Sequence, residues 1–492
     1  EENLALRKLS DSIDSSMVEV SDEEVRRASQ SEGAGVGFGV NSFAGVPNPE
    51  RGVGITRVFN IFNPAGAERD DLCEIRLWDW VGDIRRMKVT DTSGNPVEFA
   101  KIDGGFQQYW DHKFLRVLVR VKLPAFGYTT IVVSEAPVVE YPFYYGGTYN
   151  ILGYDNDYIL ENEFIRAKFD RETMGIVSLI DKSTGCEKIK AGESAGLVQI
   201  DSQLEGNSAW VIGKHHAFHE INDIKRIDRF EFGDLRIGYR FEAKVLGSTV
   251  NCEIALDKGA KALNVHLNVD WNERAGRFAP ILAYRVPVDY EVSEYLRDVP
   301  MGVARTGNEN HDIPALTYVE ALGSDSPVYV MTDSKYGYRG FENAILSTLI
   351  NTAHNPDFDP ERGKHEINLA IGVGTPCPRG MADISESYNH PLRYVSTNPH
   401  KGRLAPSGTL LEAETGSAKI TSITLTPSGS LLVRLNELAG KTAKVVLKPD
   451  SVVSAREVDL MGHTTGDVKI DGGRVSLEVK PYCITAVEIV TE

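Results

Sequence analysis

The sequence has few cysteines, no long apolar run and a deficit of positive charge. Its cysteines are odd in number, scattered and never in Cys-x-x-Cys spacing, which argues against a zinc ribbon and favours reduced thiols in a cytoplasmic setting. They are Cys73, Cys186, Cys252, Cys377 and Cys483. No apolar run approaches the roughly 20 residues that a membrane-spanning helix requires. The first residues also lack an apolar signal core, as a fragment would too. We therefore expect no membrane association.

Negative charge predominates, with 53 lysines and arginines against 70 aspartates and glutamates, for a formal net charge of −17. Nucleic acids and anionic membranes both attract clustered positive charge, so we expect neither as a partner. Fractions of 41% apolar and 25% charged residues are ordinary for a soluble globular protein. Because 492 residues are too many for one hydrophobic core, we expect two to four domains.

Helix-like spacing of apolar residues is confined to the first 30 residues. The residues that carry it are Leu4, Leu6, Leu9, Ile13, Met17 and Val18. Ser21 precedes Glu24 by three positions, which is the capping-box pattern of a helix N-terminus. We therefore predict a short helical unit over residues 1–30, and a linker over the Gly-rich residues 31–54.

From residue 55 onwards the pattern is that of strands. Residues 55–140 hold four or five alternating segments, among them 115–123, which predicts a small β-sandwich. Residues 150–400 hold many more strand candidates and no convincing helix, which predicts two large stacked sheets. Residues 415–492 again have the pattern of a small β-sandwich. The fold class predicted from these patterns is mainly β.

A predicted β-hairpin at residues 158–186 has the most distinctive sequence. Leu160-Glu161-Asn162-Glu163-Phe164 opens its first strand, Arg171–Gly175 supplies the turn, and Ile176–Ile180 begins the second strand. Further characteristic segments are Val269-Asp270-Trp271-Asn272-Glu273, Asp298–Gly302 with Asp312–Ala315, and Asp333-Ser334-Lys335-Tyr336-Gly337-Tyr338. Together these segments resemble glycoside hydrolase family 38, the retaining α-mannosidases, from about residue 57 to residue 489.

The resemblance implies both a fold and a missing part. It implies a galactose-mutarotase-like supersandwich at 150–400, flanked by the two smaller β-sandwiches, with residues 1–30 as the remnant of a three-helix bundle. In this family the zinc ligands, the nucleophile and the acid/base residue lie in an N-terminal β/α barrel. Hydrolysis with retention of the anomeric configuration requires two neighbouring carboxyl groups. No barrel precedes the β-region here. We therefore assign no catalytic residue and no metal ligand to this chain, expect zinc only in the parent enzyme, and expect the chain alone to be inactive.

By the same resemblance, the supersandwich lends aromatic loop residues to the mouth of the barrel site. Asn207–Trp210 resembles the segment that supplies one such ring, so Trp210 is the first candidate for stacking on mannose. Tyr336 and Tyr338 are further candidates, and Asn343 could bond sugar hydroxyls. The implied partners are a mannose-containing oligosaccharide and the N-terminal catalytic barrel, with a homo-oligomer as a further candidate assembly.

Other interpretations of the sequence stay open. His215, His216, His219 and Glu220 suggest a zinc site, but successive strand residues face opposite sides and no fourth ligand is marked, so a solvated loop is the better interpretation. A stand-alone mutarotase-like epimerase would need a histidine acid and a glutamate base. Its candidates are His215, His266, Glu253 and Glu273. A carbohydrate-binding module would need only a shallow aromatic pocket.

Overall fold

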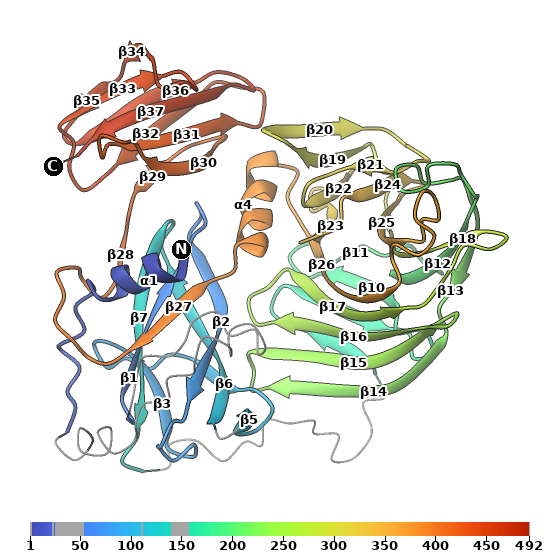
Figure 1. Ribbon diagram of the computed structural model, residues 1–492, viewed down its shortest axis with the longest axis horizontal. Coiled ribbons are helices and arrows are strands. Elements are labelled where there is room, and N and C mark those ends of the chain that lie inside the picture. Colours follow the sequence, from blue (N-terminus) through green and yellow to red (C-terminus); the bar gives the residue numbers. More distant parts are fainter. Residues whose placement is uncertain (1, 22–23, 25–53, 110–111, 139–156, 492) are drawn as a thin grey trace.

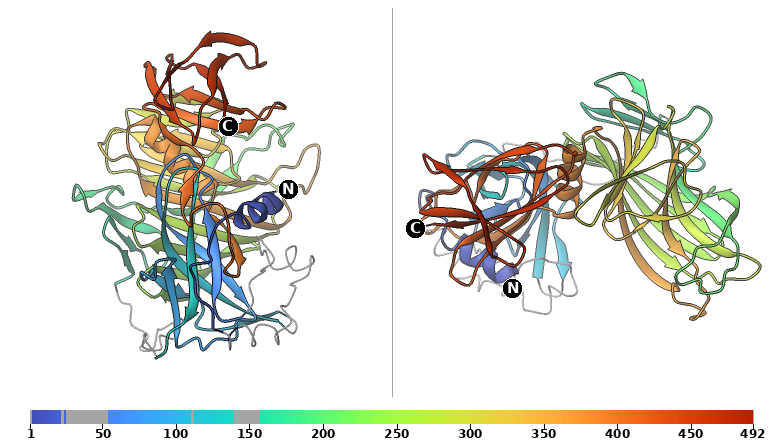
Figure 2. Two further views of the ribbon diagram at one scale, coloured as in Figure 1. Left: turned by 90° about the vertical axis from the view of Figure 1, so that its left-hand side faces the viewer. Right: turned by 90° about the horizontal axis from the view of Figure 1, so that it is seen from above.

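The computed structural model describes residues 2–21, 24, 54–109, 112–138 and 157–491, and most of its regular structure is β. Figure 1 shows two small groups of sheets on one side and a larger group of sheets on the other. This confirms the predicted fold class: mainly β, with a supersandwich flanked by two smaller sandwiches. Figure 2, in its right-hand view, shows the large sheets lying beside the two smaller sandwiches.

Within the predicted helical unit, helix α1 spans Glu2–Ser10. Residues 11–21 are not helical, contrary to the predicted spacing, and Ile13 instead forms a β-bridge with Leu404. The hydroxyl of Ser10 donates to Asn60 Oδ1 over 2.6 Å, which ties the helix to the first small sandwich. The backbone amide of Glu24 donates to Ser21 Oγ over 3.2 Å, as a capping box requires. Most of the predicted second helix and nearly all of the 31–54 linker lie outside the described residues.

The first small sandwich packs two antiparallel sheets over a core that contains Ile61, Ile75 and Val117. One sheet comprises β1 (Arg57–Phe62), β3 (Met87–Asp91), β7 (Gly127–Glu135), β27 (Arg393–Thr397) and β28 (Gly408–Thr409). The other comprises β2 (Arg69–Trp78), β4 (Phe99–Lys101), β5 (Gln107–Tyr109) and β6 (His112–Leu123). Strand β27 comes from the segment predicted to form the large sheets, yet it pairs with β1, Asn60 opposite Val395.

The supersandwich stacks a six-stranded sheet on a nine-stranded sheet, with one core between them. The six-stranded sheet runs β13 (His215–Glu220), β12 (Gly196–Ser202), β18 (Ala279–Pro287), β25 (Ala344–Asn351), β24 (Gly337–Phe341), β21 (Ile313–Pro314). The nine-stranded sheet runs β14 (Asp223–Phe232), β15 (Arg236–Val245), β16 (Ser248–Asp257), β17 (Ala262–Trp271), β26 (Gly363–Val373), β23 (Val328–Thr332), β22 (Tyr318–Leu322), β19 (Glu294–Val299), β20 (Gly302–Thr306). Burial alternates along β17, because a strand between core and solvent turns every second side chain inward.

The predicted hairpin is present and closes one edge of the same core. Its four-stranded sheet runs β11 (Cys186–Glu187), β10 (Ile176–Asp181), β9 (Ile165–Phe169), β8 (Ile159–Glu161). The carboxylate of Asp170 accepts hydrogen bonds from the amides of Glu172 and Thr173, which fixes the turn. Met174, with φ of 53°, completes it.

Helix α4 (Pro378–Asn389) corrects the expectation that residues 150–400 hold no helix. It buries Met381, Ala382 and Ser385 on one side. Proline at its first turn is a recognised helix-start signal, because proline has no amide to leave unpaired there. Figure 1 shows α4 between the supersandwich and the small sandwiches.

The C-terminal sandwich is built from two further antiparallel sheets around Val433, Leu435, Val445 and Val487. One sheet runs β29 (Glu412–Glu414), β32 (Ala443–Lys448), β36 (Arg474–Val479), β35 (Lys469–Asp471). The other runs β30 (Ala418–Leu425), β31 (Leu431–Glu437), β37 (Ile484–Val490), β33 (Ser454–Val458), β34 (Thr464–Asp467). A small β-sandwich was predicted over residues 415–492, and the first strand of the observed sandwich, β29, begins slightly earlier, at Glu412.

Candidate functional site

Four loops meet near one end of the supersandwich, and we call this region the loop end. They are residues 203–214, 272–278, 333–336 and 352–362. The strand register brings them together: Ser202 pairs with Ala279, Ile281 with Asn351, and Trp271 with Gly363. The 333–336 loop leads into β24, whose Gly337 lies opposite Thr348. Long-range pairing therefore gathers loops that are more than 140 residues apart in the chain.

Hydrogen bonds hold the loop that carries Trp210 against the loop that follows β25. The amide of Asn207 donates to Asn355 Oδ1 over 3.0 Å, and Ser208 Oγ accepts from the amides of His354 and Asn355 over 2.8 and 2.9 Å. Asn351 Nδ2 also donates to the carbonyl of Ser208. The segment that precedes Trp210 is thus fixed by four bonds, which preorganises the position of the ring.

Large aromatic side chains stand exposed at the loop end. Trp210 is 74% exposed, Phe358 80% and Tyr336 57%. A shared exposed aromatic surface marks a binding or docking region more often than scattered single residues do. The structure therefore places Trp210 and Tyr336, two of the four predicted sugar contacts, at one end of the domain with their rings available.

The other two predicted sugar contacts have structural roles. Tyr338 is fully buried, and its hydroxyl bonds to Thr332 Oγ1 and to the carbonyl of Thr317, so its ring cannot stack on a sugar. Asn343 lies in the two-residue turn between β24 and β25, where its φ of 53° suits asparagine. Its Oδ1 accepts from the amide of Val292 over 3.0 Å. Tyr338 is therefore a core residue, and Asn343 is a turn residue.

The histidine-rich segment forms β13 at the edge of the six-stranded sheet, and not a loop. His219 Nε2 contacts Asp201 Oδ2 over 3.0 Å, while the exposed His216 packs beside Phe278. Within the part of the chain that the structure describes, no group of three or more His, Cys, Asp or Glu side chains is placed to hold a metal ion. Zinc therefore finds no matching ligand set among these residues.

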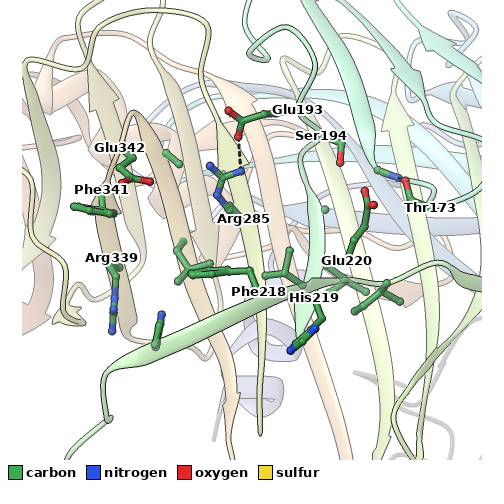
Figure 3. Close-up of a pocket in the computed structure, with 18 of the residues that line it drawn as sticks. Thr173, Glu193, Ser194, Phe218, His219, Glu220, Arg285, Arg339, Phe341 and Glu342 are labelled. Carbon is green, nitrogen blue, oxygen red and sulfur yellow. Dashed lines mark hydrogen bonds and ion pairs between the residues drawn. The ribbon is translucent and has the colours of Figure 1, made fainter. Parts of the chain in front are cut away.

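A cavity of about 540 Å³ opens on the outer face of the six-stranded sheet, and we call it the outer-face cavity. Its lining combines β12, β13, β18 and the β24–β25 hairpin with the loops before β10 and β12. On one side in Figure 3 lie Arg339, Phe341 and Glu342, and on the other Thr173, Ser194 and Glu220. Of these six residues, the sequence pattern had singled out only Glu220, as part of the histidine-rich segment.

Ion pairs neutralise both arginines of the outer-face cavity. Arg285 Nη1 lies 2.7 Å from Glu193 Oε2, as the dashed line in Figure 3 shows. Arg339 Nη2 lies 2.8 Å from Asp312 Oδ1, and both of these side chains are at least nine-tenths buried. Burial, with the Arg339 cation nearby, lowers the pKa of His215 to about 4. The imidazole of His215 is therefore neutral at pH 7.

The candidate acid and base of a mutarotase-like epimerase meet on the nine-stranded sheet. His266 and Glu253 are cross-strand partners on β17 and β16 and line a groove of about 530 Å³. However, His266 Nδ1 is bonded to Asn368 Oδ1 at 2.6 Å, and Nε2 to Asn268 Nδ2 at 2.9 Å. Because both ring nitrogens are engaged, His266 is poorly placed to protonate a sugar ring oxygen.

Sequence reasoning missed Phe358 at the loop end and Phe218 and Phe341 in the cavity. Two prolines near Phe358 were visible in the sequence, but the position of this loop at the loop end depends on the pairing of β18 with β25. All five cysteines are unpaired. Among the described residues, no helix is long and apolar enough to cross a membrane.

Comparison with protein families gives two matches. The model of the glycosyl hydrolases family 38 C-terminal domain matches residues 160–359. The model of the glycosyl hydrolases family 38 C-terminal beta sandwich domain matches residues 418–487. Together they cover more than half of the chain. A comparison with curated protein sequences found no match.

Solved structures share the fold over nearly the whole chain. An α-mannosidase from Enterococcus faecalis V583 aligns with 99% of this chain at 14% identity and a TM-score of 0.72. A family 38 glycosyl hydrolase protein from Enterococcus faecalis aligns with 99% at 15% identity and a TM-score of 0.73. The chain spans 58% and 60% of these two proteins. The match of both family models, within one shared fold, establishes that this chain belongs to glycosyl hydrolase family 38 and carries the family's C-terminal β-domains.

Proposed function

We propose that the chain is the non-catalytic C-terminal portion of a retaining, zinc-dependent α-mannosidase, and that its loop end completes the sugar site of an N-terminal catalytic barrel. The observation that carries this proposal is the group of exposed aromatic rings on loops fixed by hydrogen bonds. Zinc and both catalytic carboxyl groups would belong to the barrel. When bound there, zinc would supply Lewis-acid chemistry.

The indole of Trp210 is the central element of the proposal. Its broad apolar face is exposed, and the backbone before it is held by Asn355 and Ser208. A ring already fixed in place loses little conformational freedom when it stacks on the apolar face of a mannose unit. Tyr336 would supply a second contact, while Phe358 would pack against the barrel.

The remaining features of the proposal concern location and partners. Five unpaired thiols, three of them exposed, support a reducing, cytoplasmic location. The partners would be a mannose-containing oligosaccharide and the catalytic barrel of the same enzyme, with a homo-oligomer as a further candidate. The net charge of −17 disfavours nucleic acid as a partner.

The test is zinc-supplemented hydrolysis of 4-nitrophenyl α-mannoside, first by this chain alone and then by the complete enzyme in which the barrel precedes it. We expect no turnover by the chain alone. In the complete enzyme, Trp210→Ala removes a stacking interaction of about 1 kcal/mol, so kcat/KM falls about five- to tenfold.

Met461→Ala is the matched control, because Met461 is equally exposed but lies in the C-terminal sandwich. We expect its kcat/KM to stay within twofold of the wild type. Turnover by the chain alone would refute the non-catalytic assignment. Equal activity of Trp210→Ala and Met461→Ala would refute the role given to the loop end.

A further inference from the structure

The mouth of the outer-face cavity lies apart from the loop end along the strands of the six-stranded sheet, whereas its inner wall at His215 directly follows the 203–214 loop. Its Glu342 stands in the turn before Ala344, whereas Asn351 at the far end of β25 donates to the carbonyl of Ser208, two residues before Trp210. Seven residues of strand separate Ala344 from Asn351, which corresponds to roughly 23 Å. The mouth of the cavity at Glu342 is therefore outside the reach of a single sugar unit held by Trp210.

The floor and walls of the cavity offer apolar contact of the kind that a sugar ring uses. Val198 and Leu346 belong to the apolar cluster on this face of the sheet. Phe218, 53% exposed, stands on β13, and Phe341 lines the opposite side. A cavity of this size falls within the roughly 300–1,000 Å³ typical of small-molecule sites.

The charges of the cavity select against anions. Arg285 is paired with Glu193 and Arg339 with Asp312, so both cationic groups are already neutralised. By contrast, Glu220 and Glu342 are exposed at the cavity and make no side-chain hydrogen bond or ion pair to any residue that the structure describes. Two available carboxylates repel a phosphate, sulfate or carboxylate ligand, but they accept hydrogen bonds from hydroxyl groups well.

His215 adds a neutral polar group to the inner wall. Neither of its ring nitrogens has a hydrogen-bond partner among the described residues. A neutral imidazole has one donor and one acceptor, and leaving each unpaired in a buried place is energetically unfavourable. A ligand hydroxyl can both donate and accept, so it matches this group better than an amine or an anion does.

We propose that the outer-face cavity is a second carbohydrate-binding site, which holds a neutral hexose unit between Phe218 and Phe341 with its hydroxyls on Glu220, Glu342 and His215. This inference does not depend on the proposed role of the loop end. It assigns binding only, and no catalytic step.

The experiment is calorimetric titration of this chain with methyl α-mannoside and methyl β-glucoside, with putrescine and inorganic phosphate as cationic and anionic probes. We expect saturable binding of at least one hexoside and none of phosphate. Phe218→Ala and Glu342→Gln each weaken that binding at least fivefold. Met461→Ala, which alters only the C-terminal sandwich, leaves it within twofold, and Trp210→Ala is titrated in parallel to identify any binding at the loop end. Thermal melts monitored by circular dichroism verify that each variant is folded.

The ring signals of His215, in protein labelled with ¹³C-histidine and assigned with His215→Gln, give a second readout at the cavity of the wild-type protein. They should shift on addition of the hexoside and saturate at the calorimetric midpoint. Three outcomes overturn the inference: no hexoside binds, binding is lost only in Trp210→Ala, or putrescine binds through Glu342 in place of any hexoside. The second of these would leave the proposed function of the loop end intact.

Discussion

Glu320 should make the supersandwich less stable as the pH rises. It lies on β22 with no exposed surface, near Tyr329 of β23 and close to the start of α4. Burial raises the pKa of Glu320 to about 9, and the backbone amide of Thr375 and the cation of Arg305 offset this only partly. A carboxyl group that is neutral in the folded chain and ionised in the unfolded chain ties stability to pH.

The magnitude follows from the two pKa values. Between pH 4.5, the ordinary value for glutamate, and about 9, the folded state binds one more proton than the unfolded state. The contribution of Glu320 to the free energy of unfolding therefore falls by about 1.4 kcal/mol per pH unit across that window. Glu320→Gln keeps the shape of the side chain and removes the titration.

We therefore expect Glu320→Gln to gain stability relative to the wild type by about 4 kcal/mol between pH 5 and pH 8. The measurement is urea unfolding of both proteins at each pH, followed by amide hydrogen exchange in peptides that span β22 and β23. Comparing the two proteins at the same pH cancels the titration of every other group. A difference in unfolding free energy that stays constant with pH would show that Glu320 is ionised in the folded chain.

Two further substitutions test the surroundings of the cavity. Asp312→Ala removes the carboxylate that pairs with the buried guanidinium of Arg339 and that accepts from Thr348. We therefore expect the free energy of unfolding in urea to fall by about 3–5 kcal/mol. The fall should be much smaller when Asp312→Leu is combined with Arg339→Met, because no buried charge then remains unpaired. Asn343→Val places a β-branched residue at a φ of 53°, whereas Asn343→Gly keeps the turn and loses only the bond to Val292. We expect the valine variant to be less stable than the glycine variant by about 1–2 kcal/mol. Equal thermal stability of the two variants would contradict the assigned turn.

Local patterns predicted most strands, because a strand between core and solvent must alternate. The run at Ala262–Trp271 is strand β17 with that alternation, and the turn of the 158–186 hairpin depends on Asp170 and the residues beside it. Other elements departed from the predictions. Helix α4 is short and lies among strands, β13 stands where a solvated loop was expected, and β27 joins the first small sandwich in place of the large sheets.

The candidate site was predictable only in part, because exposure depends on where a strand begins. Tyr336 and Tyr338 are two residues apart and look equivalent in the sequence. Strand β24 starts at Gly337, so Tyr336 remains in the loop with its ring exposed, while Tyr338 enters the core. Asn343 likewise looked like a polar contact, yet the two-residue turn uses its backbone and its side chain.

The order of the amino acids was enough to predict the fold class and the family, since both depend on local sequence patterns, and it offered four candidate sugar contacts. Which of those residues share a surface depends instead on how the sheets pair. The loop end exists because β12, β18 and β25 pair in register, and β27 joins β1 across more than 300 residues. Contacts between residues so distant in the chain are set by the packing of whole sheets, and no local pattern encodes them.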